Sequence, residues 1–277
     1  MAIADRFYRI VVDALTHDRL TLPTLPEVAL RIQALLRDED VAVAAVVKEI
    51  QSDPALAVRL LRVANSAAVR GGRSVDSIQQ AVTRLGLQYT RLLVNGLVLE
   101  QMFRSNSPML KERLGTCWRD SVEVAALARA LAAQCTLLQP ELAMLGGLIH
   151  RVGTLPILRM AEAHTDAIDT PAELDEVIDR LAPRVGSMVL RAWHFPAELV
   201  DLPVQWPDLR RAHEGAADYA DVVIVAVLRL RADKGGEPVP DGIPAFAKLD
   251  LEPDFALGSE GPLASSYQES LGLLRAA

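Results

Sequence analysis

The stretch SDPALAVRLLRVANSA, residues 52–67, decides the fold class. Asp53 is a favourable N-cap and Pro54 suits the first helical position, so a helix is expected to begin at these two residues. Behind them, apolar side chains recur at helical spacing and form the inward face: Leu56, Leu60, Leu61 and Ala64. Arg59 and Arg62 fall on the opposite face. The stretch therefore predicts an amphipathic helix that packs against other helices.

The helical period continues on both sides of this stretch. In the first half, helices are expected over residues 4–17, 27–37, 41–51 and 88–103. Asp76 and Gln79 have the spacing of a capping box, and Gly86 suits the end of the short helix that follows them. In the second half, helices are expected over 109–135, 139–161, 171–181, 184–193, 208–232 and, weakly, 264–275, with a loop over 234–244. The sequence shows no strand-like alternation, so the predicted fold class is all-α.

The composition supports a packed helical protein. Of the 277 residues, 51% are hydrophobic and 23% are charged, as in globular proteins, and only 4% are aromatic. The core must therefore be built from Ala, Leu and Val, which suits close-packed helices. The polar segment SNSP at 105–108 is the clearest linker. We therefore expect an N-terminal helical subdomain at 1–105 and a second subdomain at 106–277.

Charge, hydropathy and cysteine spacing exclude several classes of protein. The longest apolar runs, such as 222–228, are far shorter than the roughly 20 residues that span a bilayer. The first 19 residues carry charges throughout, unlike a signal peptide, so a soluble cytoplasmic protein is expected. Residues 162–277 hold 10 basic and 21 acidic side chains, which disfavours broad nucleic-acid binding. Residues 50–105 hold seven basic and three acidic side chains and leave room for a local anion site. Cys117 and Cys135 have no spacing typical of a disulfide framework.

Several further motifs are specific to one family. In chain order they are LPTLPEVALRIQALL (22–36), the stretch at 52–67, SIQQAVTRLG (77–86), WRDS (118–121), GGLIHRVGTL (146–155), VGSMVLRAWHFP (185–196) and AADYAD (216–221). Over about residues 18–230 the chain resembles the HDOD family, the bacterial HD-related output domains. The resemblance implies a helical module of two packed parts, an N-terminal bundle and an HD-like half. It also implies a role in bacterial signalling, usually without catalysis.

The HD-like half resembles HD phosphohydrolases, whose metal site needs a first His, an adjacent His-Asp pair and a later Asp. On this resemblance, the ligand positions fall at Asp120, at the pair His150 and Arg151, and at Asp221, with Asp218 close enough to be an alternative for the last position. Imidazoles and carboxylates bind the divalent metals that activate water, whereas the guanidinium of Arg151 repels a metal. The sequence therefore predicts a degenerate HD site with no metal, no cofactor and no catalytic residue. We interpret His150 as a core histidine bonded to the backbone. Asp120 and Asp221 are either solvated or ion-paired carboxylates, or functional ones.

Arg151 raises a hypothesis of its own. Its forked donors could serve two acceptors at once, so the guanidinium would occupy the metal position and pair with Asp120, Asp221 or both. The alternative is that the side chain points to solvent and pairs with nothing.

Other residues carry weaker signals. A possible anion or partner patch consists of Arg59, Arg62, Arg70 and Arg73, with a solvated helix face as the alternative. The residues that match the family signature are Asn65, Ser66, Trp118 and Trp193. We expect the polar pair at 65–66 to tie a loop to a helix end and the two tryptophans to anchor the core. The glycine pair at 146–147 favours close helix packing, and the histidines at 164, 194 and 213 are expected at the surface or in caps.

The predicted function is regulatory rather than catalytic. We expect a signal-transduction module that acts through contacts with a signalling protein partner, with no membrane partner. Two alternatives stay open. One is a divergent metal-dependent phosphohydrolase or phosphodiesterase, against which Arg151 argues. The other is a sensor that binds a nucleotide or a cyclic dinucleotide.

Overall fold

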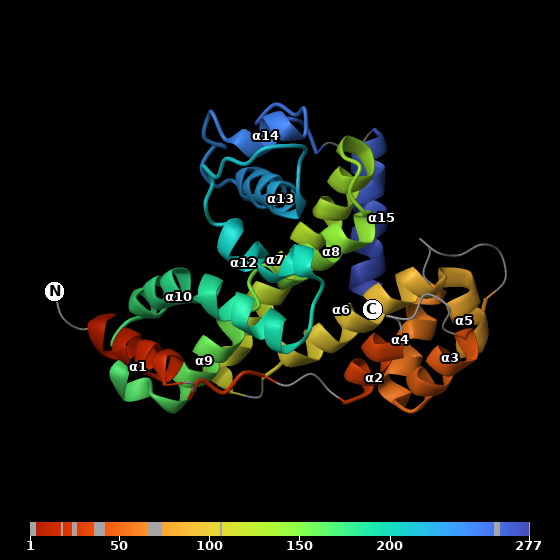
Figure 1. Cartoon of the computed structure of the whole chain (residues 1–277), viewed down its shortest axis with the longest axis horizontal. Coiled ribbons are helices and arrows are strands. Elements are labelled where there is room, and N and C mark those ends of the chain that lie inside the picture. Colours follow the sequence, from red (N-terminus) through yellow and green to blue (C-terminus); the bar gives the residue numbers. More distant parts are fainter. Residues whose placement is uncertain are drawn as a thin grey trace.

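The computed structural model describes residues 4–17, 19–23, 27–35, 42–65, 74–105, 107–257 and 261–276, and within these ranges it contains helices and no strand (Figure 1). The predicted all-α class is confirmed. The first half contains α1 (Ala4–Thr16), α2 (Glu27–Leu35), α3 (Val43–Gln51), α4 (Pro54–Ala64), α5 (Ile78–Leu85) and α6 (Leu87–Met102). No helix in the described part of the chain is both long and apolar enough to cross a membrane.

The second half is built around one long helix. Its elements are α7 (Pro108–Cys135), α8 (Pro140–Ile149), α9 (Thr154–Ala163), the 3₁₀ turn η1 (Thr165–Ala167), α10 (Pro171–Ala192), α11 (Ala197–Val200), α12 (Leu202–Gln205), α13 (Tyr219–Asp233), α14 (Pro244–Lys248) and α15 (Pro262–Ala276). Helix α7 packs against α8, α13 and α15. One apolar core extends from the helices of the first half into those of the second.

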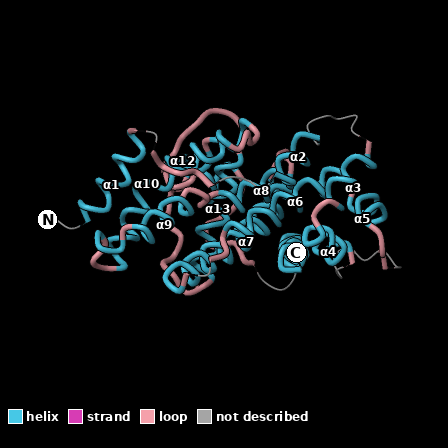
Figure 2. Tube along the Cα trace, turned by 90° about the horizontal axis from the view of Figure 1, so that it is seen from below, coloured by secondary structure: helices cyan, strands magenta, loops and turns pink. Residues whose placement is uncertain are grey.

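The order of elements along the chain differs from their order in space. Figures 1 and 2 show α2 to α5 at one end of the molecule, and α1 with α9 and α10 at the other. Helix α1 packs on α10 and α9, where Arg6 pairs with Asp166 at 2.9 Å and Arg180 stacks over the Tyr8 ring. Helix α15 returns to pack on α7 and α4. The division at 105–108 stays a prediction, but each end of the chain contacts the opposite half.

The helix start predicted at Asp53 and Pro54 is confirmed in detail. The Asp53 carboxylate accepts hydrogen bonds from the backbone N–H groups of Ala55 at 3.0 Å and Leu56 at 3.1 Å, and α4 begins at Pro54. Gly86 ends α5 with a φ of 78°, a left-handed conformation that favours glycine. The capping box at Asp76 and Gln79 is wrong by one residue. The N-cap is Ser77, whose hydroxyl accepts from the N–H of Gln80 at 3.3 Å.

Removing the cap at Asp53 has a defined cost. We expect Asp53→Ala to lower the free energy of unfolding by about 1 kcal/mol, because two backbone donors lose their acceptor. Asp53→Asn keeps an acceptor of similar length and should lose much less. Urea denaturation of the two variants beside the wild type measures the difference. Equal losses in both variants would assign the effect to charge rather than to capping.

The second half contains the short helices α11 and α12, which the sequence does not predict, and it differs from the expected helix bounds at three further places. The helix expected over 139–161 is divided into α8 and α9 by a turn at 150–153, because this turn lies directly against the backbone of α10. Conversely, Pro183 lies inside α10 instead of separating two helices. The helix expected over 208–232 begins only at Tyr219, because Asp218 caps it there. The last two helices are α14, which begins where the expected loop ends, and α15.

Candidate functional site

Three of the four predicted HD positions line one cavity of about 620 Å³. Asp120 comes from the middle of α7, and His150 and Arg151 come from the turn after α8. The opposite wall is the last part of α13, from Val227 to Arg231, together with the loop that follows it. Arg151 and Arg231 also line a smaller cavity of about 230 Å³ next to it.

His150 is a buried neutral histidine. Its Nδ1 atom lies 2.6 Å from the carbonyl oxygen of Gly147, and since a carbonyl only accepts, Nδ1 carries the proton. The ring meets Trp206 edge-on at 5.1 Å between centroids, and the Trp206 Nε1–H donates to the His150 carbonyl at 2.9 Å. Burial lowers the pKa of His150 to about 3, and the cations of Arg151 and Arg231 add to this effect. The interpretation of His150 as a core histidine agrees with these contacts.

Burial of His150 predicts a pH-dependent stability. In the unfolded chain its pKa is about 6.5, so below that pH the unfolded state binds a proton that the folded state does not. Stability is therefore lost as pH falls from about 6.5 toward the folded pKa of about 3. By pH 5 the loss from this one group should reach about 2 kcal/mol. We expect His150→Gln to lose less stability than the wild type between pH 7 and pH 5 in urea titrations.

A second histidine serves as the control for this measurement. His164 is only partly buried and ends α9. His164→Gln should keep the pH dependence of the wild type. If His150→Gln and the wild type lose equal stability on acidification, His150 takes up its proton in the folded state.

Two acidic residues of the cavity, Asp120 and Glu123, are paired with cations other than Arg151. The Lys234 ammonium lies 3.0 Å from an Asp120 oxygen and 2.6 Å from a Glu123 oxygen, and Arg275 pairs with Glu123 at 3.3 Å. Burial lowers the pKa of Lys234, but the hydrogen bonds to Glu123 and Asp120 outweigh it and raise the pKa overall. Asp120 is thus an ion-paired carboxylate.

The pairing expected for Arg151 is wrong. Within the described part of the chain, Arg151 forms no ion pair, because Asp120 pairs with Lys234 and Asp221 pairs elsewhere. Arg231, across the cavity, likewise has no acidic partner among the described residues, and its guanidinium carbon lies 6.0 Å above the Trp206 ring. The cavity therefore presents two guanidinium groups without a carboxylate partner.

Asp221 lies away from the other three predicted positions. It is in the first turn of α13, whereas the cavity with Asp120 and His150 is lined by Val227 and later residues. At 1.5 Å per residue these positions are about 9 to 15 Å apart along the helix axis. The four predicted positions are therefore not one ligand set, and the residues present do not fit a metal bound in the manner of HD phosphohydrolases.

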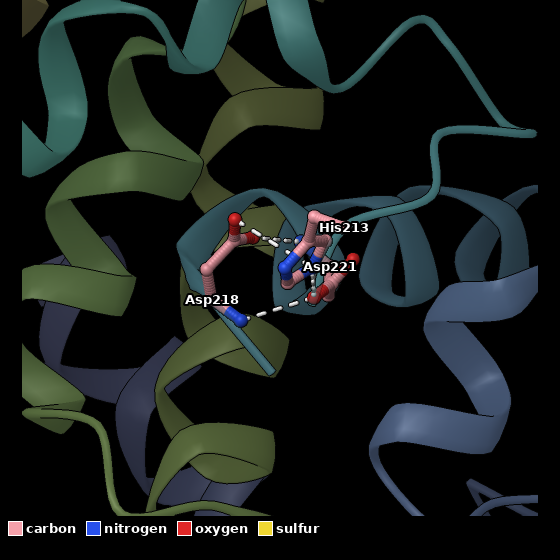
Figure 3. Close-up of side chains that lie close together, drawn as sticks. All are labelled: His213, Asp218 and Asp221. Atoms are coloured by element: carbon pink, nitrogen blue, oxygen red, sulfur yellow. Dashed lines mark hydrogen bonds and ion pairs between the residues drawn. The ribbon is translucent and has the colours of Figure 1, made fainter. Parts of the chain in front are cut away.

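A different set of side chains surrounds Asp221 (Figure 3). Its carboxylate accepts from Arg211 at 2.9 Å, from the His213 Nε2 at 2.7 Å and from the backbone N–H of Asp218 at 3.0 Å. Asp218 in turn accepts from the N–H of Asp221 and from both terminal nitrogens of Arg211, which completes a capping box. Burial raises the pKa of Asp218, but the hydrogen bonds from Arg211 and the Asp221 N–H outweigh it and lower the pKa overall.

His213, Asp218 and Asp221 place one ligand atom each within 4.8 Å of one another. The guanidinium of Arg211 already supplies the positive charge between the two carboxylates, so the cluster is complete as a cap. The sequence predicts His213 at the surface or in a cap, and it does lie at the cap of α13, but neither its contact with Asp221 nor the role of Arg211 was predicted. The signal was present, since Asp218 and Asp221 have the spacing of a capping box three residues apart.

The predicted arginine patch is only partly visible. Arg59 pairs with Glu100 and donates to the Leu97 carbonyl at 3.3 Å. Arg59 and Arg62 line a cavity of about 610 Å³ between α4, α6, α7 and α15, which also contains Trp118. Arg70 and Arg73 lie outside the described residues.

The family-signature residues have structural contacts. The Asn65 side chain donates to the Val75 carbonyl and accepts from the Val75 N–H, both at 2.8 Å, which ties the end of α4 to the segment before α5. Ser66 lies outside the described residues. Trp193 is buried and donates to the Pro23 carbonyl at 2.7 Å, whereas Trp118 is half-buried and packs on Phe103.

The helical bundle, the HD-like half and the incomplete ligand set define an HD-related protein. The model of the HDOD domain matches residues 22–205, which is more than half of the chain, so the protein belongs to the HDOD family. The resemblance inferred from the sequence motifs is thereby confirmed.

The chain is also similar to individual proteins. A proposed metal-dependent phosphohydrolase of Shewanella amazonensis SB2B is 29% identical, with a TM-score of 0.85 over 99% of this chain and 100% of that one. A proposed signal transduction protein of Marinobacter aquaeolei VT8 shares the fold at 20% identity, with a TM-score of 0.65 over 99% of this chain and 67% of that one. An uncharacterized protein of Treponema pallidum (strain Nichols) is 22% identical over 89% of this chain, which spans 50% of that curated relative.

Proposed function

We propose that this protein is a non-catalytic signal-transduction module that acts through contacts with another signalling protein. The observation that carries the proposal is the composition of the cavity that contains Asp120 and His150. Arg151 and Arg231 line it as cations, and Asp120 is held by Lys234. A divalent cation would meet two guanidinium groups there in place of a bridging carboxylate.

Membership in the HDOD family supports a signalling role, because these modules resemble hydrolases in fold and act as outputs of signalling chains. A module without catalytic activity can pass on a signal only by binding another molecule. This reasoning favours a protein partner over a product.

The second candidate is a divergent metal-dependent phosphohydrolase. It is favoured by the Shewanella protein, whose name proposes that activity and which is 29% identical over its whole length. The two candidates differ in one requirement, a bound divalent metal.

Metal content and hydrolysis separate the two candidates. The purified chain is incubated with Mn²⁺, Fe²⁺ or Zn²⁺, desalted, and assayed for bound metal and for hydrolysis of bis(p-nitrophenyl) phosphate. We expect less than stoichiometric metal and no turnover. Stoichiometric metal together with turnover that disappears in Asp120→Ala would overturn the non-catalytic function.

The partner is tested in a separate experiment. The chain is crosslinked in its native cell, the captured proteins are identified, and each is then produced and measured against the purified chain. We expect one of them to bind directly with a measurable Kd. If no captured protein binds the purified chain directly, the proposed action through protein contacts fails.

A further inference from the structure

Arg151 and Arg231 both line the cavity of about 620 Å³ and also the smaller cavity beside it. Within the described part of the chain neither arginine forms an ion pair or donates a hydrogen bond. At the cavity between α4, α6, α7 and α15, Arg59 pairs with Glu100 and Arg275 with Glu123, whereas Arg62 forms no ion pair among the described residues. Two unpaired guanidinium groups facing one cavity are unusual in a chain whose acidic residues outnumber its basic ones by 36 to 29.

Among the described residues, the acidic groups around the cavity form no ion pair with these two arginines, and they include Glu237 on the loop after α13. Asp120 and Glu123 are both held by Lys234, and Glu123 also by Arg275. His150 is neutral because it is buried. Asp179 on α10 lines the smaller cavity and forms no ion pair with either arginine. Burial lowers the pKa of Arg231 and the nearby cation of Arg151 lowers it further, whereas the carboxylates of Asp179 and Asp120 act in the opposite direction.

We propose that this cavity binds the phosphate group of a small organic phosphate monoester. Two guanidinium groups offer forked donors that match the oxygens of a phosphate, and their two charges balance a phosphate dianion. A monocarboxylate would neutralise only one of them. The anion thus takes the position that a metal and its bridging carboxylate hold in an HD phosphohydrolase.

The remaining walls indicate an organic body beside the phosphate. Val124, Leu209, Val227 and Leu228 line the larger cavity with the Pro238 and Pro240 loop. The larger cavity, of about 620 Å³, is within the range of small-molecule sites, which combine apolar walls with a few polar groups, and the cavity of about 230 Å³ adjoins it. An apolar group attached to the phosphate would therefore bury surface that inorganic phosphate leaves exposed to water.

This inference rests on the proposed function in one respect, since it requires that no divalent metal occupies the cavity. It goes beyond that function, because it gives the module a ligand in addition to a protein partner. The site differs from the arginine-lined cavity of Arg59 and Arg62, which lies between α4, α6, α7 and α15.

Calorimetric titration of the metal-free protein tests the site, with phenyl phosphate, inorganic phosphate and benzoate as probes. We expect phenyl phosphate to bind more tightly than inorganic phosphate because of the apolar walls, and benzoate to bind more weakly than phenyl phosphate because it carries one charge. Arg151→Gln and Arg231→Gln should each weaken phenyl phosphate binding at least tenfold, since each removes charge-assisted hydrogen bonds. Neither should destabilise the free protein, because neither arginine has an acidic partner to strand.

Two control variants locate the site. Arg191→Gln removes the same charge from an exposed pair with Asp201 and should bind phenyl phosphate as the wild type does. Arg62→Gln tests the other arginine-lined cavity and should also bind normally. If Arg151→Gln does not fold, Arg151→Lys keeps the charge without the fork and should still bind several times more weakly.

The possible results separate this inference from the proposed function. Absence of phenyl phosphate binding by the wild type at millimolar concentration overturns the inference, as does equal weakening by Arg151→Gln and Arg191→Gln, or weakening by Arg62→Gln alone. Without bound metal these results leave the proposed function standing. If phenyl phosphate binds only after Mn²⁺ is added and is released by a chelator, both the inference and the non-catalytic function fail.

Discussion

Replacing Gly147 by alanine is expected to destabilise the protein by more than about 3 kcal/mol. Gly147 lies in α8 where this helix crosses α7, and an added Cβ would lie 2.4 Å from the Ala125 Cα and 2.6 Å from its backbone nitrogen. These are backbone atoms of α7, so no side-chain rotation relieves the clash and the two helices must separate. Helix α7 packs against α8, α13 and α15, so moving α8 away from α7 disturbs the centre of the core. Thermal or urea unfolding of Gly147→Ala measures the loss.

A glycine elsewhere in a helix provides the matched control. Gly272 lies in α15, where an added Cβ would meet no atom within 4 Å. Gly272→Ala should stabilise the protein by up to about 1 kcal/mol, because alanine favours helix more than glycine does. The same substitution is thus expected to have opposite signs at the two positions. If Gly147→Ala is as mild as Gly272→Ala, the axes of α7 and α8 are further apart than described.

Asp221→Asn is the second substitution with a large expected effect. It should lower the free energy of unfolding by roughly 3–5 kcal/mol. The Asp221 side chain is 1% exposed and accepts hydrogen bonds from Arg211 and His213. The amide keeps the shape but removes the charge, so the buried cation of Arg211 loses one of its two carboxylates. The amide nitrogen also presents donors to groups that themselves donate. Equilibrium unfolding at pH 7 measures the loss.

Asp201→Asn makes the same chemical change at the surface. Asp201 pairs with Arg191, and both side chains are more than half exposed. Asp201→Asn should lower the free energy of unfolding by at most about 1 kcal/mol, because exposed ion pairs contribute little. Comparable losses in the two variants would show that the cluster around Asp221 is open to water.

The helices and their caps follow well from sequence because the signals are local. The start at Asp53 and Pro54 and the end at Gly86 depend only on neighbouring backbone groups, and both are confirmed. The break at 150–153 and the continuity of α10 through Pro183 depend on contacts between distant segments. Gly153, in the turn at 150–153, lies against the carbonyl of Ala182, and no pattern of neighbouring residues predicts this contact. Periodicity therefore predicts the helices but not where packing divides or joins them.

The candidate site was predictable only in part. The family motifs brought Asp120, His150 and Arg151 to one cavity, but the assignment of Asp221 to that cavity was wrong. Two aspartates three residues apart carried both a ligand pattern and a capping pattern, and the structure uses them for capping. The lack of an acidic partner for Arg151 and Arg231 arises because Lys234 reaches Asp120 from a segment 114 residues away. Sequence spacing cannot reveal such competition between cations for one carboxylate.

The position of α1 has a consequence for the order of events during protein synthesis. The apolar side of this helix, with Phe7 and Val11, is covered by elements of the other half, and its contact Arg6–Asp166 joins residues 160 positions apart. Translation at about 5–20 residues per second delivers these partners roughly 8–32 s after α1. During that interval the nascent chain exposes an amphipathic helix that a ribosome-associated chaperone could bind. Docking of α1 therefore awaits the emergence of α10, long after α2 to α5 have left the ribosome.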